Sequence, residues 1–95
     1  MYSNEHTLQD LLRKAYHRLD MDDIAMEMEV KRAYTFVAGD FISRLTRTAK
    51  FSKGTLTLVI MSPALKHELS YRRSSLAEKI NETIGRAAVK QIVLI

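Results

Sequence analysis

The chain has 95 residues, 46% of them hydrophobic, with a formal net charge of +4 and no cysteine. This length and apolar content fit one domain with a hydrophobic core, and the missing cysteine excludes disulfides, thiolate metal sites and a cysteine nucleophile. No apolar run approaches the roughly 20 residues of a membrane span, and the N-terminus lacks the pattern of a signal peptide. We therefore expect a single domain over residues 1–95, without a C-terminal tail, in a cytoplasmic protein that has no membrane partner.

Charge is divided unevenly along the chain. Residues 1–30 hold three Lys or Arg and seven Asp or Glu, whereas residues 31–95 hold twelve and four. The basic remainder could meet a polyanion such as nucleic acid, or it could be an ordinary solvated surface. Charge alone does not separate these two interpretations.

The chain is predicted to begin with one helix, which ends at a break over residues 19–23. Ser3 or Thr7 can cap the helix, and Asp20, Asp22 and Asp23 favour its end, because Asp is a poor residue for a helix interior. The apolar stripe of this helix consists of Leu8, Leu11, Leu12, Ala15 and Leu19.

A second helix is predicted from about residue 31 to residue 46. Gly39 lies in its middle, where Gly costs about 1 kcal/mol relative to Ala, so we expect another backbone to approach closely there. Phe36 lies on a basic face and could stack on a base, but packing against the first helix is the favoured interpretation. The core stripe of this helix consists of Val30, Tyr34, Val37, Phe41 and Leu45.

The second half of the chain begins with the pattern of a β-hairpin. Residues 48–52 and 55–61 are the predicted strands, with Lys53 and Gly54 as the turn. Ser62 then caps a third helix, which runs from Pro63 to about residue 84 and is ended by Gly85. The inward residues of this helix are Leu65, Leu69, Leu76, Ile80 and Ile84.

An apolar segment, residues 89–95, is predicted to end the chain as a last strand. The element order is then α-α-β-β-α-β, which predicts an α+β fold with a three-stranded mixed sheet. We expect the hairpin and the last strand to share this sheet, with the second and third helices packed on one face. The crossover through the third helix is expected to be right-handed.

The chain offers no catalytic or metal-binding pattern. His6, His17 and His67 are not spaced as ligands on one helix, and the three glycines form neither a phosphate-binding loop nor a dinucleotide fingerprint. No nucleophile elbow is present. We therefore expect no enzyme activity, no metal and no cofactor.

The basic residues of the second half are the remaining candidates for a site. Tyr71, on the third helix, either packs over the hairpin or stacks on an unpaired base while neighbouring cations meet phosphates. We expect these residues to border one positive groove with Tyr71 at its rim. The predicted nucleic-acid-binding residues are Arg44, Arg47, Lys50, Lys53, Lys66, Tyr71, Arg72 and Arg73.

Residues 8–95 resemble the DciA-like family of bacterial proteins, in particular its short members from Bacteroidetes-type bacteria. Residues 62–71 are the most specific part of this resemblance, and Tyr34 stands where the family usually has Trp. The matching motifs are Ala33-Tyr34, Val37-Ala38-Gly39, Gly54-Thr55-Leu56, Ser62-Pro63-Ala64-Leu65, Glu68-Leu69-Ser70-Tyr71, Ile80-Asn81 and Gly85.

The resemblance implies a domain similar to type II KH modules and a role in DNA replication, as a DNA-binding loader or recruiter of the replicative helicase. Two features depart from what it implies. The Gly-x-x-Gly clamp of KH modules is absent, so KH-style gripping of RNA is not implied. Longer relatives carry a flexible tail linked to helicase and DNA contacts, whereas this sequence stops at its last strand.

Three functional hypotheses follow. The first is a non-enzymatic module that binds single-stranded or forked DNA through phosphates and limited stacking, and that recruits or loads the replicative helicase. The second is a protein-interaction adaptor that uses the first helix and the acidic segment, residues 20–29. The third is a KH-like RNA binder, which the missing clamp disfavours.

Overall fold

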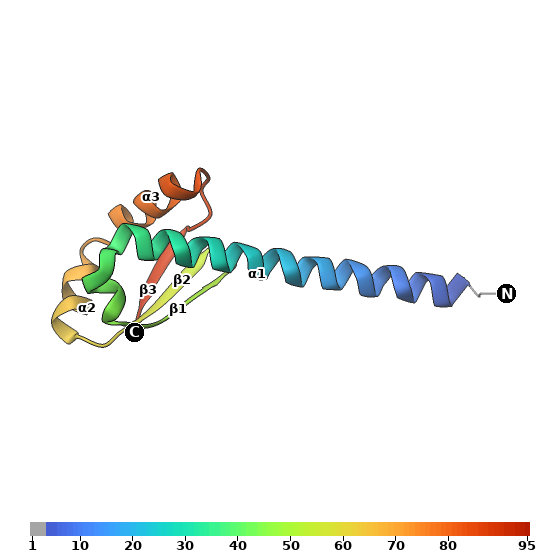
Figure 1. The fold of residues 1–95 in the computed structure, drawn as a ribbon, viewed down its shortest axis with the longest axis horizontal. Helices are drawn as coiled ribbons and strands as arrows, with labels where there is room; N and C mark the ends of the chain where they lie inside the picture. Colours follow the sequence, from blue (N-terminus) through green and yellow to red (C-terminus); the bar gives the residue numbers. More distant parts are fainter. Residues whose placement is uncertain (1–3) are drawn as a thin grey trace.

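The computed structural model describes residues 4–95, with side chains described at residues 8, 10–12 and 21–95 (Figure 1). Ser3, one of the two predicted caps, lies outside the described residues, as does the side chain of Thr7. The elements in order are α1 (Asn4–Arg44), β1 (Thr46–Ser52), β2 (Thr55–Ile60), α2 (Pro63–Ser70), α3 (Arg73–Ile84) and β3 (Gln91–Leu94).

Helix α1 is one long element, and the predicted break at residues 19–23 is wrong. Asp22 and Asp23 lie on its exposed surface without interrupting it. An interior Asp costs less than about 0.7 kcal/mol relative to Ala, which is too little to end a helix that is stabilised elsewhere. The half of α1 nearest the sheet supplies that support, through Val30, Ala33 and Tyr34 in the core.

Gly39 kinks α1 rather than sitting at a helix crossing. Its φ of 84° and ψ of 173° are not helical, and a Cβ built there would meet no atom within 4 Å. The expected close approach of another backbone is therefore wrong, and the backbone angles are what require Gly. The kink turns the following residues, so Phe41 is 72% exposed instead of belonging to the core stripe.

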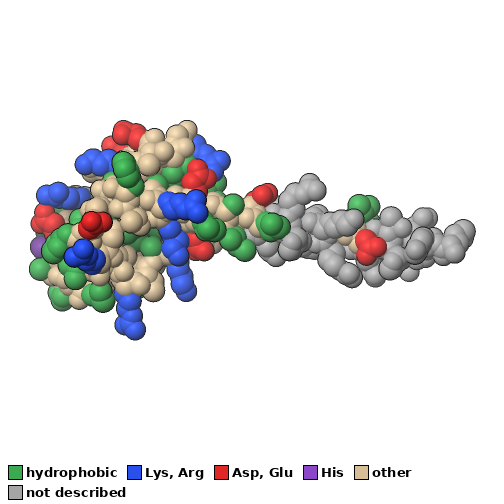
Figure 2. All heavy atoms as spheres, viewed as in Figure 1, with side chains coloured by type: hydrophobic (Ala, Val, Ile, Leu, Met, Phe, Trp, Pro, Cys, Tyr) green, Lys and Arg blue, Asp and Glu red, His purple; other side chains and the backbone are tan. Residues whose placement is uncertain are grey.

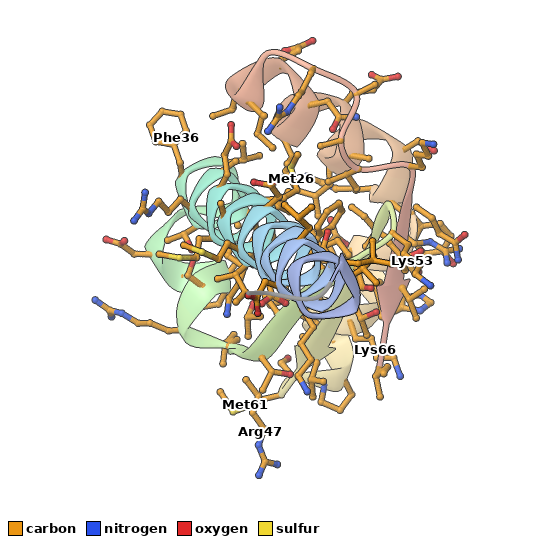
Figure 3. The ribbon with its side chains drawn as sticks, turned by 90° about the vertical axis from the view of Figure 1, so that its right-hand side faces the viewer. Met26, Phe36, Arg47, Lys53, Met61 and Lys66 are labelled. Carbon is orange, nitrogen blue, oxygen red and sulfur yellow. The ribbon has the colours of Figure 1, made fainter. Side chains whose placement is uncertain are left out.

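Phe36 is 78% exposed and points away from the body of the domain (Figure 3). Its predicted packing against a separate first helix is wrong, because that helix is the N-terminal part of α1 itself.

The sheet has the order β1-β2-β3, with β1 antiparallel and β3 parallel to the central strand β2. Lys53 and Gly54 join β1 to β2 with φ of 49° and 83°, the positive pair that a tight two-residue hairpin needs. The backbone carbonyl of Gly54 also accepts from the amides of Lys90 and Gln91, which ties the turn to the start of β3. The predicted α+β class, the hairpin and the C-terminal strand are confirmed.

One face of the sheet is covered and the other is open. Leu56, Leu58 and Ile60 alternate along β2 as buried residues, whereas Thr55 and Thr57 between them are partly exposed. The ribbon places α1 and α3 over the same face (Figure 1). The core consists of Val30, Ala33, Tyr34, Leu56, Leu58, Ile60, Leu69, Leu76, Ile80, Val89 and Ile92.

The predicted third helix is divided into α2 and α3. The amides of Tyr71 and Arg72 donate to carbonyls three residues back, and Arg72 has φ of −115°. This joint lets Leu69 and Leu76 both reach the core from helices of different direction. The predicted ends are confirmed, since Ser62 accepts from the amide of Leu65 and Gly85 is a left-handed cap.

Candidate nucleic-acid interface

A cationic groove lies between α1 and the edge strand β1. It has a volume of about 360 Å³, and its three cations, Lys31, Arg47 and Lys50, are all exposed. Among the described residues that line it there is no acidic side chain. We call it the α1–β1 groove, and its remaining lining residues are Tyr34, Thr35, Ser43, Thr46, Thr48 and Ala49.

Successive turns of α1 face β1 and hold the two elements together. A carboxylate oxygen of Glu27 accepts from the backbone amide of Phe51 at 3.1 Å. Two turns further on, the hydroxyl of Tyr34 lies 2.7 Å from that of Thr46, which in turn donates to the carbonyl of Ile42. Because the Thr46 proton is used in this way, Tyr34 donates to Thr46. These contacts fix both walls of the α1–β1 groove.

The Glu27 contact also shows which backbone groups of β1 point away from the sheet. In an antiparallel pair the outward groups recur every second residue. Since the amide of Phe51 points outward to α1, the N–H and C=O of Ala49 point outward as well. Ala49 lines the α1–β1 groove, so its amide is a fixed donor beside the cations.

Hydroxyl groups complete the chemistry of the α1–β1 groove. Thr35 and Thr48 are exposed, and the oxygen of Ser43 is buried without a hydrogen-bond partner among the described residues. Burial raises the pKa of Tyr34, an effect that its hydrogen bond with Thr46 partly offsets, so its hydroxyl remains a neutral donor. The α1–β1 groove offers cations, hydroxyls and a backbone amide, and its described lining includes no carboxylate. This combination suits an anionic ligand such as a phosphodiester.

The prediction of a single groove is wrong, because only two of the eight predicted residues line the same hollow. Arg47 and Lys50 line the α1–β1 groove, Arg72 lines a hollow between α1 and the other helices, and Arg73 lines one beside β3. On the face of the domain that Figure 2 shows, the Lys and Arg side chains are likewise spread out rather than gathered in one patch. The other four, Arg44, Lys53, Lys66 and Tyr71, line none of these hollows.

Lys53 illustrates why proximity in sequence misled the prediction. It sits at the hairpin tip, where Ser52 pairs with Thr55, whereas Arg47 lies at the opposite end of β1. A strand rises about 3.3 Å per residue, so roughly 20 Å separates the two along β1. In Figure 3 Arg47 points away from the lower edge, near Met61, while Lys53 lies at the right and Lys66 below it.

Tyr71 marks a second candidate contact, at the joint between α2 and α3. Its ring is 76% exposed and meets His67 edge to face, with centroids 5.1 Å apart. Packing over the hairpin is therefore not its role. Arg72 pairs with Glu68 at 2.8 Å, and the Nε of Arg73 donates to the carbonyl of Ser70. The exposed ring leaves a face on which a base could stack.

One cation of the α1–β1 groove was missed as a candidate from the sequence. Lys31 lies one helical turn after Glu27 and one before Tyr34, so it is on the face of α1 that meets β1. Its place on this face is the signal that would have marked it as a candidate. This signal is readable only when the pairing of α1 with β1 is known.

The acidic segment, residues 20–29, is partly used inside the domain. Glu27 holds β1, and Glu29 pairs with Arg86 at 2.8 Å across α1 and the loop after α3. Asp22 and Asp23 remain exposed. The adaptor hypothesis therefore loses two of the acidic side chains on which it depends.

Two absences hold for the part of the chain that the structure describes. Within it, no group of three or more His, Asp or Glu side chains is placed to hold a metal ion. Within it also, no helix is both long and apolar enough to cross a membrane.

Comparison with known proteins identifies one family. Residues 5–94 match the family model described as "Dna[CI] antecedent, DciA". No curated protein matches the chain.

Proposed function

Since this chain belongs to the DciA family, whose role is the loading of the replicative helicase, we propose that it binds nucleic acid without catalysis while recruiting or loading that helicase. The observation that carries this proposal is the α1–β1 groove, with three cations, several hydroxyls and no carboxylate among its described lining residues. Chromosome replication places such a protein in the cytoplasm. The KH-like character of the domain and the preference for single-stranded or forked DNA belong to the same proposal.

The proposed mechanism is contact with the phosphate backbone. Lys31, Arg47 and Lys50 neutralise phosphates and release counterions, which gives affinity without base-specific readout. The Ala49 amide and the groove hydroxyls add directional donors that hold the strand in place. Tyr71 stacks on an unpaired base beyond the groove, and Arg72 and Arg73 flank it. Arg44, Lys53 and Lys66 contribute to the surrounding positive potential.

The test is binding of labelled single-stranded DNA, duplex DNA and RNA, measured by fluorescence anisotropy. The variant that replaces Lys31, Arg47 and Lys50 by Ala should bind all three more weakly. A matched control replaces Arg32, Lys79 and Lys90, which also removes one Arg and two Lys from exposed positions outside the groove. Because both variants lose the same net charge, a larger loss in the first variant reports local phosphate contacts.

A separate variant addresses stacking. Tyr71→Ala should weaken binding to single strands by about 1–3 kcal/mol if a base stacks on the ring. Undetectable binding of every nucleic acid by the wild-type chain at low salt would overturn the proposal. Capture of the replicative helicase by such a non-binding chain would then support the adaptor hypothesis.

A further inference from the structure

The N-terminal part of α1, residues 4–24, extends from the domain as a stalk (Figure 1). It gives the molecule a longest dimension of 65 Å, against 25 and 19 Å for the other two. Among the described side chains of α1, Met26 is the first that packs against the core. Helices in water are stabilised mostly by packing of an apolar face, yet the large apolar side chains that are described in the stalk, at residues 8, 11, 12, 21 and 24, are all exposed.

The stalk presents apolar side chains to solvent. Leu8, Leu11 and Leu12 are 58%, 60% and 51% exposed. The view in Figure 2 shows green side chains along the stalk between residues that it leaves grey. Leucines at this spacing are typical of a helix that packs against another helix.

This apolar stripe continues the face that packs in the core. Leu8 precedes Met26, and Leu12 precedes Val30, by the same interval, which is about five full turns of an α-helix. The sequence repeats the relation with Ala15 before Ala33 and Leu19 before Val37. On a regular helix Leu8 and Leu12 therefore lie on the same face as Met26 and Val30, and both leucines are exposed.

Within the stalk, the apolar pattern of residues 8–19 is symmetric. Its apolar residues are spaced identically when read in either direction from the Arg13–Lys14 bond, whereas Met21 and Ile24 lie outside this symmetric set. An antiparallel second copy centred there would present the same pattern, with Leu8 level with Leu19 of the other copy and Leu12 level with Ala15. The symmetric positions are Leu8, Leu11, Leu12, Ala15, Tyr16 and Leu19.

Charge favours the same arrangement. The stalk holds five acidic and three basic residues, and three of the acidic residues lie close together at positions 20, 22 and 23. A parallel pair would place the Asp20, Asp22 and Asp23 clusters of the two copies side by side, which costs free energy. An antiparallel pair keeps these clusters at opposite ends.

We propose that the stalk is a self-association surface, on which a second copy of the chain packs its own stalk antiparallel. The contact is two-fold symmetric, so each copy offers the same stripe to the other. The two domains then lie at opposite ends of the paired stalks. This proposal is independent of nucleic-acid binding by the α1–β1 groove.

The first test is the mass of the full chain by light scattering and sedimentation over a range of concentrations. The wild-type chain should form dimers that dissociate on dilution, whereas a Leu8→Glu, Leu12→Glu double variant should be monomeric. The matched control is Met21→Glu with Met28→Glu, since these residues are 55% and 48% exposed on the opposite side of the same helix. It should retain the dimer.

Thermal melts show whether either variant has lost its fold, and both should melt as the wild type does apart from the effect of dimer loss. A wild-type chain that stays monomeric at the highest attainable concentration would overturn the proposal. So would equal loss of the dimer in the two double variants, because the stripe would then not be the contact.

The second test fixes the direction of the pair and uses the absence of native cysteine. A mixture of Leu8→Cys and Leu19→Cys chains should form a mixed disulfide under mild oxidation. Leu8→Cys alone should not, because antiparallel pairing holds its two copies about 16 Å apart along the axis, beyond the reach of a disulfide at roughly 7 Å. Efficient cross-linking of Leu8→Cys alone would mean parallel pairing and would overturn the proposal.

Discussion

The side chain of Asn81 in α3 both donates a hydrogen bond to the backbone of Val89 and accepts one from it. Its side-chain amide donates to the carbonyl of Val89 at 2.9 Å, and its side-chain oxygen accepts from the amide of Val89 at 2.8 Å. Its own backbone carbonyl accepts from Gly85 and Arg86. One residue thus fixes the path of the chain from the end of α3 to the start of β3.

Replacing Asn81 by Ala should destabilise the domain by about 2 kcal/mol, because two partly buried groups of Val89 lose their partner. Urea denaturation measures the change. Glu82→Ala, at the exposed neighbouring position, should stay within about 0.5 kcal/mol of wild type. Equal stability of Asn81→Ala and wild type would show that the loop before β3 is held by other contacts.

Gly39→Ala should lower stability through backbone strain, not through a clash. A Cβ at this position has open space around it, but φ of 84° with ψ of 173° is a region that only Gly occupies readily, at a cost of about 1–3 kcal/mol for other residues. Gly85→Ala is the comparison, since its left-handed φ of 91° and ψ of 16° should cost other residues less, roughly 1 kcal/mol. Thermal melts should rank wild type above Gly85→Ala and Gly85→Ala above Gly39→Ala, and a Gly39→Ala chain as stable as wild type would contradict the role of the kink.

Tyr34→Phe should cost about 1 kcal/mol at neutral pH, since it removes the hydrogen bond to Thr46. Burial raises the pKa of Tyr34 from 10.0. The folded chain therefore keeps this proton where the unfolded chain has lost it, and the resulting stability is present below about pH 10 and declines as pH rises above it.

Urea denaturation of both chains at several alkaline pH values tests the Tyr34 prediction. The free energy of unfolding of the wild type should fall more steeply above that pH than that of Tyr34→Phe. Parallel declines would mean that other groups account for the alkaline loss of stability.

Glu27→Ala should loosen β1 from α1. The carboxylate of Glu27 is the acceptor for the Phe51 amide, so this amide should exchange its hydrogen faster in the variant, with a loss of stability of about 1 kcal/mol. Glu27→Gln keeps an oxygen acceptor and should lie between Glu27→Ala and wild type. Unchanged exchange at Phe51 in Glu27→Ala would contradict this tie between helix and strand.

Local chemistry made part of the fold predictable from the sequence. The alternation of Leu56, Leu58 and Ile60 identified the central strand, and Ser62 with Pro63 identified the start of α2. Gly85 identified the end of α3. Each of these signals depends on neighbours in the chain, which is why it could be read without the tertiary structure.

The remaining features depend on contacts between distant residues. The Asp residues near position 20 did not end α1, because the core contacts of Val30 and Tyr34 support a longer helix. Lys31 joined the candidate site only through the packing of α1 beside β1, and Lys53 was placed at the far end of β1 by the register of the hairpin. Sequence proximity therefore identified Arg47 and Lys50 but not the third cation of the groove.

The salt dependence of binding to single-stranded DNA tests the proposed phosphate contacts most directly. Each lost phosphate contact should flatten the slope of log K against log salt by about 0.7, so replacing Lys31, Arg47 and Lys50 by Ala should flatten it by roughly 2. The control chain with Arg32, Lys79 and Lys90 replaced should keep a slope close to that of wild type. A groove variant whose slope equals that of wild type would contradict the account, because its three cations would then make no contact with phosphate.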